Sequence, residues 1–182
     1  IIALEKTFEG RIVNPATGKK QFVMIGTQEE VSIGNQVATE VETNFKLSKD
    51  EALIERANRI GLRIAKVSDR QDVRYYFRVL EDENPNALST PGGYVYVNSG
   101  LMRRADDSEL AAVMAHEVGH IAARHSVMAM QSNMATSLIA ALVFSSVKTK
   151  KEMRQGAAVA LNLVMLGYSR EDEFEADKLG VK

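Results

Sequence analysis

HEVGH, residues 116–120, is the stretch on which the rest of this sequence depends. It has the pattern H-E-x-x-H and lies in a segment, Ser108–Met128, whose apolar residues recur with helical period. On a helix, residues four apart share one face, so the imidazoles of His116 and His120 can reach the same metal ion. The carboxylate of Glu117 projects beside that face, where it can accept a proton from water. The motif therefore indicates metal-assisted attack of water on a carbonyl, usually a peptide bond, rather than an amphipathic helix with two incidental histidines.

A catalytic zinc site needs a third protein ligand and one open position, at which the pKa of water falls to about 7. The chain has no Cys, so nitrogen and oxygen donors must hold the ion. His125 follows His116 by nine residues. At about 100° per residue, this spacing places it on the opposite face of a continuous helix. It also departs from the metzincin pattern, which has its third His six residues after the second. We therefore expect His125 to be a surface or locally hydrogen-bonded residue.

An acidic segment near the end of the sequence, SREDEFEAD at residues 169–177, is the predicted source of the third ligand. Its pattern predicts a helix on which Glu173 and Asp177, four residues apart, share one face. One of these carboxylates can bind the metal while the other orients a ligand histidine. Because charged helix faces are usually just solvated, the residues alone leave Glu171, Glu173 and Glu175 open as the ligand.

The composition indicates a single globular domain and gives no sign of nucleic-acid binding. The 182 residues include 23 Lys and Arg against 24 Asp and Glu, a formal net charge of -1. Such a balance supplies no basic surface for a phosphate backbone. The sequence begins at Ile1 without Met, and we expect that further residues followed Lys182.

Two apolar stretches of helical pattern, residues 134–147 and 156–166, follow the motif helix. Each is too short to cross a bilayer, which takes about 20 apolar residues. We expect a buried helical hairpin, and a hairpin that dips into a membrane is the alternative.

The first 26 residues are predicted to be an N-terminal hairpin or arm, separate from a catalytic domain over residues 27–182. Apolar patches at 11–13 and 21–25 flank the turn-forming residues 14–18. Helices are then expected to begin at two capping boxes, Thr27-x-x-Glu30 and Ser48-x-x-Glu51.

Two short runs rich in Tyr and Val, Tyr75–Leu80 and Tyr94–Val97, predict strands. Pro91 lies between them and cannot donate a ladder hydrogen bond, so any strand before it belongs at a sheet edge. On composition alone, a plain loop is the preferred reading of this connection. Further helix signals are an Asp106-x-x-Glu109 capping box and an N-cap at Ser169.

These motifs together resemble one family of peptidases. HEVGH followed by S-R-x-x-E-x-x-A-D at residues 169–177 is similar to the HtpX-like and CAAX-prenyl-protease-1-like zinc metallopeptidases, and within them to the soluble periplasmic BepA-like branch. The Pro91-Gly92-Gly93-Tyr94 turn and the Glu30-x-x-x-Gly34 pattern fit the same family. The likeness covers roughly residues 17 to 180 and rests on specific paired motifs.

The resemblance implies roles for individual residues. His116 and His120 match two ligands of a single Zn2+ ion, Glu173 matches the third ligand, and Glu117 matches the general base. Leu88 stands where the family usually has Phe or Tyr, and no residue is identifiable for stabilising the oxyanion.

Two further matches concern the surroundings of the ion. Asp177 corresponds to the carboxylate that orients a ligand histidine. Asn86 and Ala87 correspond to the strand that lies along the substrate, so the loop reading of this connection gives way to an open edge strand.

The sequence thus predicts an α+β, mostly helical zinc metalloendopeptidase domain of the gluzincin type, with a small β-sheet beside the active-site helix. The resemblance implies a periplasmic or cell-envelope location, with peripheral or lipid-anchored membrane association as an option. Misfolded or misassembled envelope proteins would be the substrates. A chaperone-like module that binds client proteins and retains a zinc site is the alternative, and a latent enzyme is a third reading.

Overall fold

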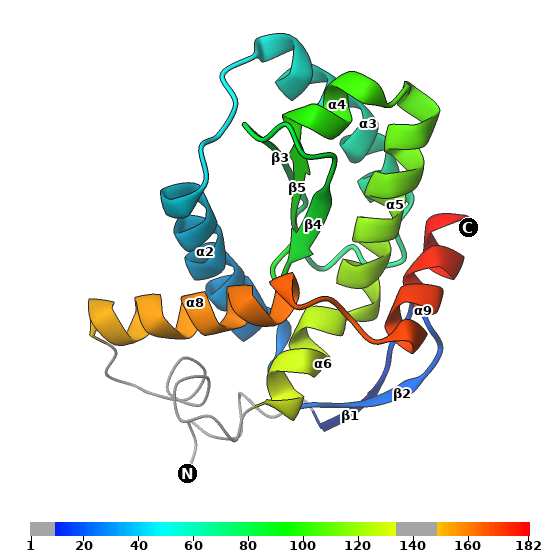
Figure 1. The fold of residues 1–182 in the computed structure, drawn as a ribbon. Coiled ribbons are helices and arrows are strands. Elements are labelled where there is room, and N and C mark those ends of the chain that lie inside the picture. The colour runs from blue at the N-terminus through cyan, green and yellow to red at the C-terminus, as the bar shows by residue number, and fades with distance from the viewer. Residues whose placement is uncertain (1–9, 134–148) are drawn as a thin grey trace.

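The computed structural model describes residues 10–133 and 149–182 and shows the predicted α+β architecture, mostly helical with small sheets (Figure 1). The apolar stretch at 134–147 lies outside the described residues. The elements, in chain order, are β1 (Gly10–Val13), β2 (Lys20–Val23), α2 (Thr27–Asn44), α3 (Glu51–Val67), β3 (Tyr76–Leu80), β4 (Ala87–Thr90), β5 (Tyr94–Asn98), α4 (Ser99–Arg104), α5 (Asp107–Ala123), α6 (His125–Ser132), α8 (Lys150–Met165) and α9 (Arg170–Gly180).

The central sheet has the order β3-β5-β4, with β5 parallel to β3 and antiparallel to β4. Both predicted Tyr-rich strands therefore form, and the segment before Pro91 is an edge strand rather than a loop. In Figure 1, β4 lies between β5 and α5, the helix that carries HEVGH. The structure also contains the predicted N-terminal hairpin, in which β1 pairs with β2. Its division from the rest of the chain at residue 26 stays a prediction.

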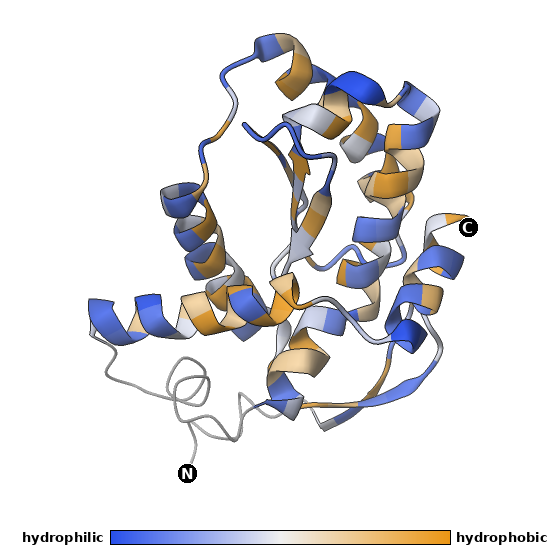
Figure 2. Cartoon of the chain, viewed as in Figure 1, coloured by the Kyte–Doolittle hydropathy of each residue, from blue (hydrophilic) through white to orange (hydrophobic). Residues whose placement is uncertain are grey.

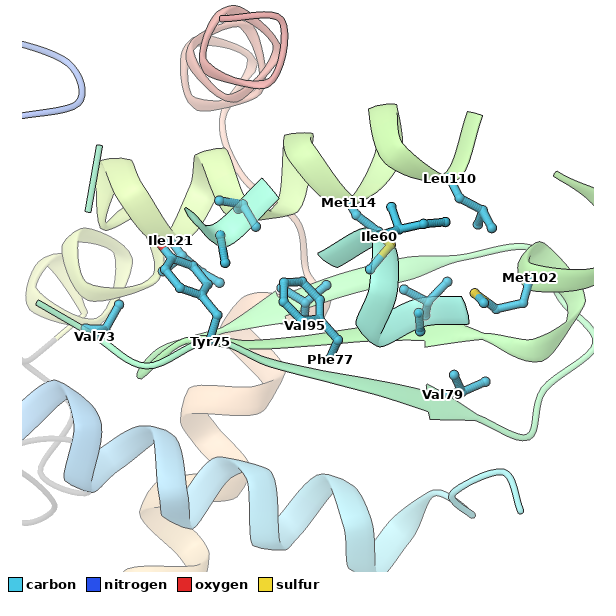
Figure 3. Packing of buried hydrophobic residues seen from close by; sticks show 14 residues of the cluster. Ile60, Val73, Tyr75, Phe77, Val79, Val95, Met102, Leu110, Met114 and Ile121 are labelled. Carbon is cyan, nitrogen blue, oxygen red and sulfur yellow. The ribbon is translucent and has the colours of Figure 1, made fainter. Parts of the chain in front are cut away.

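Alternation along β3 and β5 gives the sheet two apolar faces. Phe77, Val79, Val95 and Val97 face α3 and α5. Figure 3 shows Phe77 and Val95 beside Ile60, Met114 and neighbouring residues of that core. Leu80 and Tyr96 point to the other face and pack with α2, α6 and α8. Because side chains alternate with period two, a short strand can serve two cores at once. The C-terminal half of α8 is accordingly apolar, whereas α9 is mostly hydrophilic (Figure 2).

The N-caps of α5 and α9 are the residues that the sequence predicts. Asp106 and Glu109 form the capping box of α5, and Ser169 and Asp172 form that of α9. Gly167 follows the end of α8 with a φ of 82°, a left-handed conformation that suits glycine.

The capping box predicted at Thr27 is wrong. The N-cap of α2 is Gly26, without a side-chain cap. The Thr27 hydroxyl instead donates to Asp72, 2.8 Å away. The Glu30 carboxylate is buried and accepts from Arg70 at 2.7 Å. The Glu30 carboxylate therefore forms a long-range ion pair with Arg70 instead of a local capping box with Thr27.

The helix at residue 51 forms, but Ser48 does not cap it. Asp50 is the N-cap, and its carboxylate accepts hydrogen bonds from the backbone amides of Ala52 and Leu53 at 3.1 and 3.2 Å. A charged acceptor at a helix N-terminus is also favoured by the helix dipole, so Asp50 is the stronger cap.

The continuous helix predicted over 108–128 is in fact two helices. Arg124 adopts the left-handed conformation, with φ 64°, and separates α5 from α6. Distant side chains satisfy the carbonyls at this break: Asn14 donates to Ala122 and Ala123 at 3.1 and 3.2 Å, and Arg70 donates to Ile121 at 2.9 Å. Those partners lie about 50 to 110 residues away in the sequence, so no local pattern could have revealed the break.

Helix α2 touches the turn between β4 and β5 without any intervening side chain. A Cβ atom on Gly34 would lie 2.2 Å from the Pro91 carbonyl oxygen. The amide of Gly92 in the same turn donates to Glu30 at 3.3 Å. This close approach sets the position of β4, the strand next to the motif helix.

We therefore expect Gly34→Ala to destabilise the fold although alanine is the better helix former. The forced shift of α2 costs about 1–3 kcal/mol, which outweighs the propensity gain of up to about 1 kcal/mol. Ser32→Ala, an exposed position on the same helix, is the control and should be neutral or slightly stabilising. Urea unfolding measures both variants, and equal stability of Gly34→Ala and wild type would contradict the packing argument.

Candidate metal centre

Three donor atoms from two helices converge on one point. His116 and His120 lie on α5, and their Nε2 atoms face each other 3.0 Å apart. Glu173 on α9 places its carboxylate oxygens 3.2 Å from His116 Nε2 and 3.7 Å from His120 Nε2. No other residue of the described chain belongs to this group of ligand atoms, which all lie within 4.8 Å of one another.

This triangle fits a zinc ion. Zinc bonds of 2.0–2.2 Å to imidazole nitrogen and carboxylate oxygen in tetrahedral geometry place ligand atoms about 3.3–3.5 Å apart. The three distances scatter around that value. Three protein donors also leave one tetrahedral position open, as in catalytic rather than structural zinc sites.

Small residues let α9 approach α5 closely enough to deliver Glu173. A Cβ on Gly119, inside the motif, would lie 2.8 Å from the Ala176 carbonyl oxygen. A Cβ on Gly180 would lie 3.0 Å from the backbone nitrogen of His116. The glycine of HEVGH thus has a packing role that the sequence analysis did not identify.

Asp177 lies behind His116, as the four-residue spacing from Glu173 predicts. Its carboxylate is 2.8 Å from His116 Nδ1, so it can accept the proton of that nitrogen and leave Nε2 free for a metal. The Asp177 side chain is largely exposed, and this contact is open to water.

The side chain of His120 is less exposed to water than that of His116. Burial is the main cause that lowers its pKa to about 3, and the neighbouring His125 and His116 add to the effect. The ring is therefore neutral at physiological pH and offers a lone pair. Tyr168 stacks on it with ring centroids 4.1 Å apart, and the Tyr168 hydroxyl lies 2.9 Å from Ser126 Oγ.

Tyr168 is a site residue that sequence reasoning missed. Burial raises the pKa of its hydroxyl, which therefore stays protonated. A tyrosine between a helix-ending glycine and an N-cap serine carries no motif of its own, so no sequence signal pointed to it.

The predicted location of His125 is wrong in one respect. It is a locally hydrogen-bonded histidine, as one of the two expectations had it, but it is buried rather than on the surface. The opposite-face argument assumed a continuous helix, and the break at Arg124 turns His125 back toward the centre. Its Nδ1 lies 2.8 Å from His120 Nδ1.

Glu117 is buried beside the donor triangle and faces the edge strand. Burial raises the pKa of its carboxyl, while the nearby charge of His116 acts in the opposite direction. A carboxylate whose pKa is raised is a stronger base, which suits a group that accepts and returns a proton.

A cavity of about 270 Å³ joins these elements. The predicted residues Asn86 and Ala87 lie on its wall across from the histidines, so the structure brings all the sequence-predicted site residues together, with Asp177 behind His116. The cavity lining comprises Asn86, Ala87, Leu88, Ser89, His116, Glu117, His120, Val164, Met165, Gly167, Tyr168 and Glu173.

Comparison with known proteins adds independent evidence. The model of Peptidase family M48 matches residues 51–182. The beta-barrel assembly-enhancing protease of Escherichia coli O157:H7 is 25% identical over 177 residues, covering 92% of this chain and 36% of that protein. A Vibrio cholerae counterpart is 32% identical over 163 residues, covering 84% and 34%.

A mitochondrial relative shows the same partial coverage. The mitochondrial metalloendopeptidase OMA1 of Schizosaccharomyces pombe is 36% identical over 127 residues, covering 68% of this chain and 36% of that protein. The chain thus spans about a third of the length of these relatives.

The lowered pKa of His120 predicts a pH effect on the metal-free protein. Between about pH 3 and 6.5 the unfolded chain binds a proton at this residue that the folded chain does not, so the contribution of His120 to stability is lost as pH falls through that range. His120→Asn removes this loss. Urea unfolding from pH 7 to 4 should show the variant becoming more stable relative to wild type as pH falls, and parallel curves would contradict the prediction.

Proposed function

Because this chain belongs to peptidase family M48, we propose that it is the catalytic domain of a zinc-dependent metalloendopeptidase. The observation that carries the proposal is the convergence of two imidazoles and one carboxylate on a point beside the buried Glu117. Since the chain spans about a third of its relatives, the proposal concerns the domain and not the whole protein.

His116, His120 and Glu173 would hold one Zn2+ ion per chain. When bound, the ion would polarise the scissile carbonyl and make water a nucleophile near neutral pH. Asp177 fixes the His116 ring through Nδ1, so that its other nitrogen is presented without a proton.

Glu117 would act as the proton carrier of the reaction. It accepts a proton from the attacking water and returns it to the nitrogen of the leaving amine. Its burial keeps bulk water away from the carboxylate, which lines the same cavity as Ser89 of β4. The proton therefore moves between groups held on α5 and groups bound along the edge strand.

The substrate would bind as an added strand. An extended polypeptide can pair with the outer edge of β4 through main-chain hydrogen bonds, which need no particular side chains. Asn86, just before this strand, and Ala87, its first residue, lie on the wall of the cavity that Glu117 also lines. Strand pairing would thus carry a peptide bond past the proposed zinc ion.

The names of the relatives suggest the setting. Two of them, from Vibrio cholerae and Escherichia coli, are named beta-barrel assembly-enhancing proteases, and these names support a role in quality control of cell-envelope proteins, in the periplasm or at a membrane surface. Misfolded or misassembled envelope proteins would be the substrates. Within the described residues, no helix is both long and apolar enough to cross a membrane.

A client-binding module that retains zinc is the competing function. A structural zinc site fills all four positions with protein ligands. The group found in the described part of the chain has three donors and a buried glutamate beside it, which favours hydrolysis.

Glu117→Gln separates the two functions. The amide keeps the size of the side chain and leaves all three donors in place, so zinc should stay bound while the proton acceptor is lost. We expect peptide hydrolysis to fall by at least about a hundredfold, the low end for general acid–base catalysis. Glu171→Gln on the surface of α9 is the control for loss of one charge. Comparable hydrolysis by Glu117→Gln and wild type would refute the mechanism, and zinc binding without any hydrolysis by wild type would support the client-binding module.

Glu173→Gln tests the donor set itself. An amide oxygen is a much poorer zinc ligand than a carboxylate, so the variant should lose zinc at chelator concentrations that wild type withstands. Zinc content after dialysis against graded chelator measures the effect. If Glu173→Gln and the surface control Glu171→Gln keep equal zinc, Glu173 is not the third ligand.

A further inference from the structure

His125 is a buried histidine with a partner at each ring nitrogen, and the proposed reaction does not use it. Its Nδ1 lies 2.8 Å from His120 Nδ1, and its Nε2 lies 3.2 Å from a carboxylate oxygen of Glu175 on α9. Only 2% of its side chain is exposed. Glu175 in turn forms an ion pair with Lys19, which precedes β2 of the N-terminal hairpin. Four side chains from three parts of the chain are thus connected in series.

The position of the protons in this series follows from one requirement. If His120 binds a metal through Nε2, that nitrogen carries no proton, and the proton of the neutral ring must be on Nδ1. At 2.8 Å, His120 Nδ1 can only donate to His125 Nδ1, which must then be an acceptor. His125 therefore carries its own proton on Nε2 and donates it to Glu175. Each hydrogen bond in the series has a single direction.

We propose that His125 is a positioning residue: it transmits the orientation and the negative charge of Glu175 to His120 and so fixes the metal-binding tautomer of that ring. The inference rests on the proposed zinc site. Partners of this kind typically change metal affinity or activity ten- to a hundredfold when removed.

The two metal-facing histidines are then oriented in two different ways by the same helix. His116 meets a carboxylate of α9 directly, but the Asp177 side chain is 66% exposed. His120 meets a carboxylate of α9 through His125, and the Glu175 side chain is only 15% exposed. Hydrogen bonds to charged groups are worth more where water cannot compete. The path through His125 is therefore shielded from water, whereas the direct contact at Asp177 is open to it.

The break between α5 and α6 is what makes this path available. A continuous helix would carry His125 away from His120, whereas the left-handed Arg124 starts a new helix at His125 and turns its ring toward the centre. A purely structural reading is that His125 only fills volume next to Tyr168, with ring centroids 5.8 Å apart. The two readings differ in whether the ring nitrogens of His125, and not only its volume, contribute to metal binding by His120.

Nitrogen-15 NMR of the histidine rings in the zinc-loaded protein distinguishes them directly. We expect His125 to be the neutral tautomer with its proton on Nε2, and the Nδ1 proton of His120 to exchange slowly with water. A His125 ring that carries a proton on Nδ1 would overturn the proposal, because no hydrogen bond to His120 could then exist.

Zinc affinity, measured by chelator competition, provides the second readout. His125→Phe keeps the ring volume without nitrogens and should weaken zinc binding ten- to a hundredfold. His125→Asn places an acceptor near the position of Nδ1 and should lose clearly less. Glu171→Gln, which removes a charge from the same helix, should match wild type.

The possible outcomes distinguish an error in the role of His125 from an error in the proposed zinc-dependent function. If folded His125→Phe binds zinc as tightly as wild type, or if His125→Asn loses as much as His125→Phe, the positioning role is wrong while the zinc site stands. If His125→Phe does not fold, the NMR tautomer and the Asn variant still decide. A wild-type protein that takes up no zinc would contradict the proposed function itself.

Discussion

The structure depends on one buried acid. Glu30 of α2 is 1% exposed and accepts two hydrogen bonds from Arg70, at 2.7 and 3.0 Å, with Arg124 a further 3.1 Å contact. A buried ion pair offsets its desolvation cost only when further hydrogen bonds satisfy the remaining polar atoms. Further hydrogen bonds of this kind are present: Arg70 also donates to the carbonyl of Ile121, and Gly92 donates to Glu30. The cluster joins α2, the segment after α3, the end of α5 and the turn between β4 and β5.

That cluster sets the distance on which hydrolysis would depend. The strand proposed to pair with substrate, β4, and the helix proposed to bind the metal, α5, are separate elements joined through β5 and α4. The turn after β4 is fixed to α2 at Gly34 and Gly92, and the end of α5 is fixed to the same cluster through Ile121. Removing one member of a buried ion pair typically costs about 3–5 kcal/mol, because it leaves an unpaired charge. A catalytic geometry held in this way is sensitive to residues far from the metal.

The sequence predicted what is encoded locally and missed what is encoded at long range. The motif helix and the caps at Asp106 and Ser169 follow from short patterns, and the structure contains them. The edge strand before Pro91 follows only from the family resemblance, since composition alone favours a loop, and the structure contains it as well. The prediction of a capping box at Thr27 is wrong because the Glu30 carboxylate pairs with Arg70, forty residues away in the sequence. The prediction of a continuous helix through Arg124 is wrong because the carbonyls at the end of α5 have their hydrogen-bond partners in distant segments. A local reading cannot weigh a cap against an ion pair that only the folded chain brings together.

The choice among the acids of α9 shows how the fold resolves an ambiguity that the sequence leaves. Spacing alone allowed Glu171, Glu173 or Glu175 to face the histidines. In the structure Glu173 approaches both Nε2 atoms, with Asp177 one turn later behind His116. Glu175 is two positions from both Glu173 and Asp177, so it lies about 160° around the helix from each of them. It is on the side that meets His125, and Glu171 is exposed. One helix thus presents two acidic stripes, and each supports a different histidine. Because the glycine contacts with α5 fix the rotation of α9, the same contacts decide which acid would be the ligand and which would support the ligand histidines.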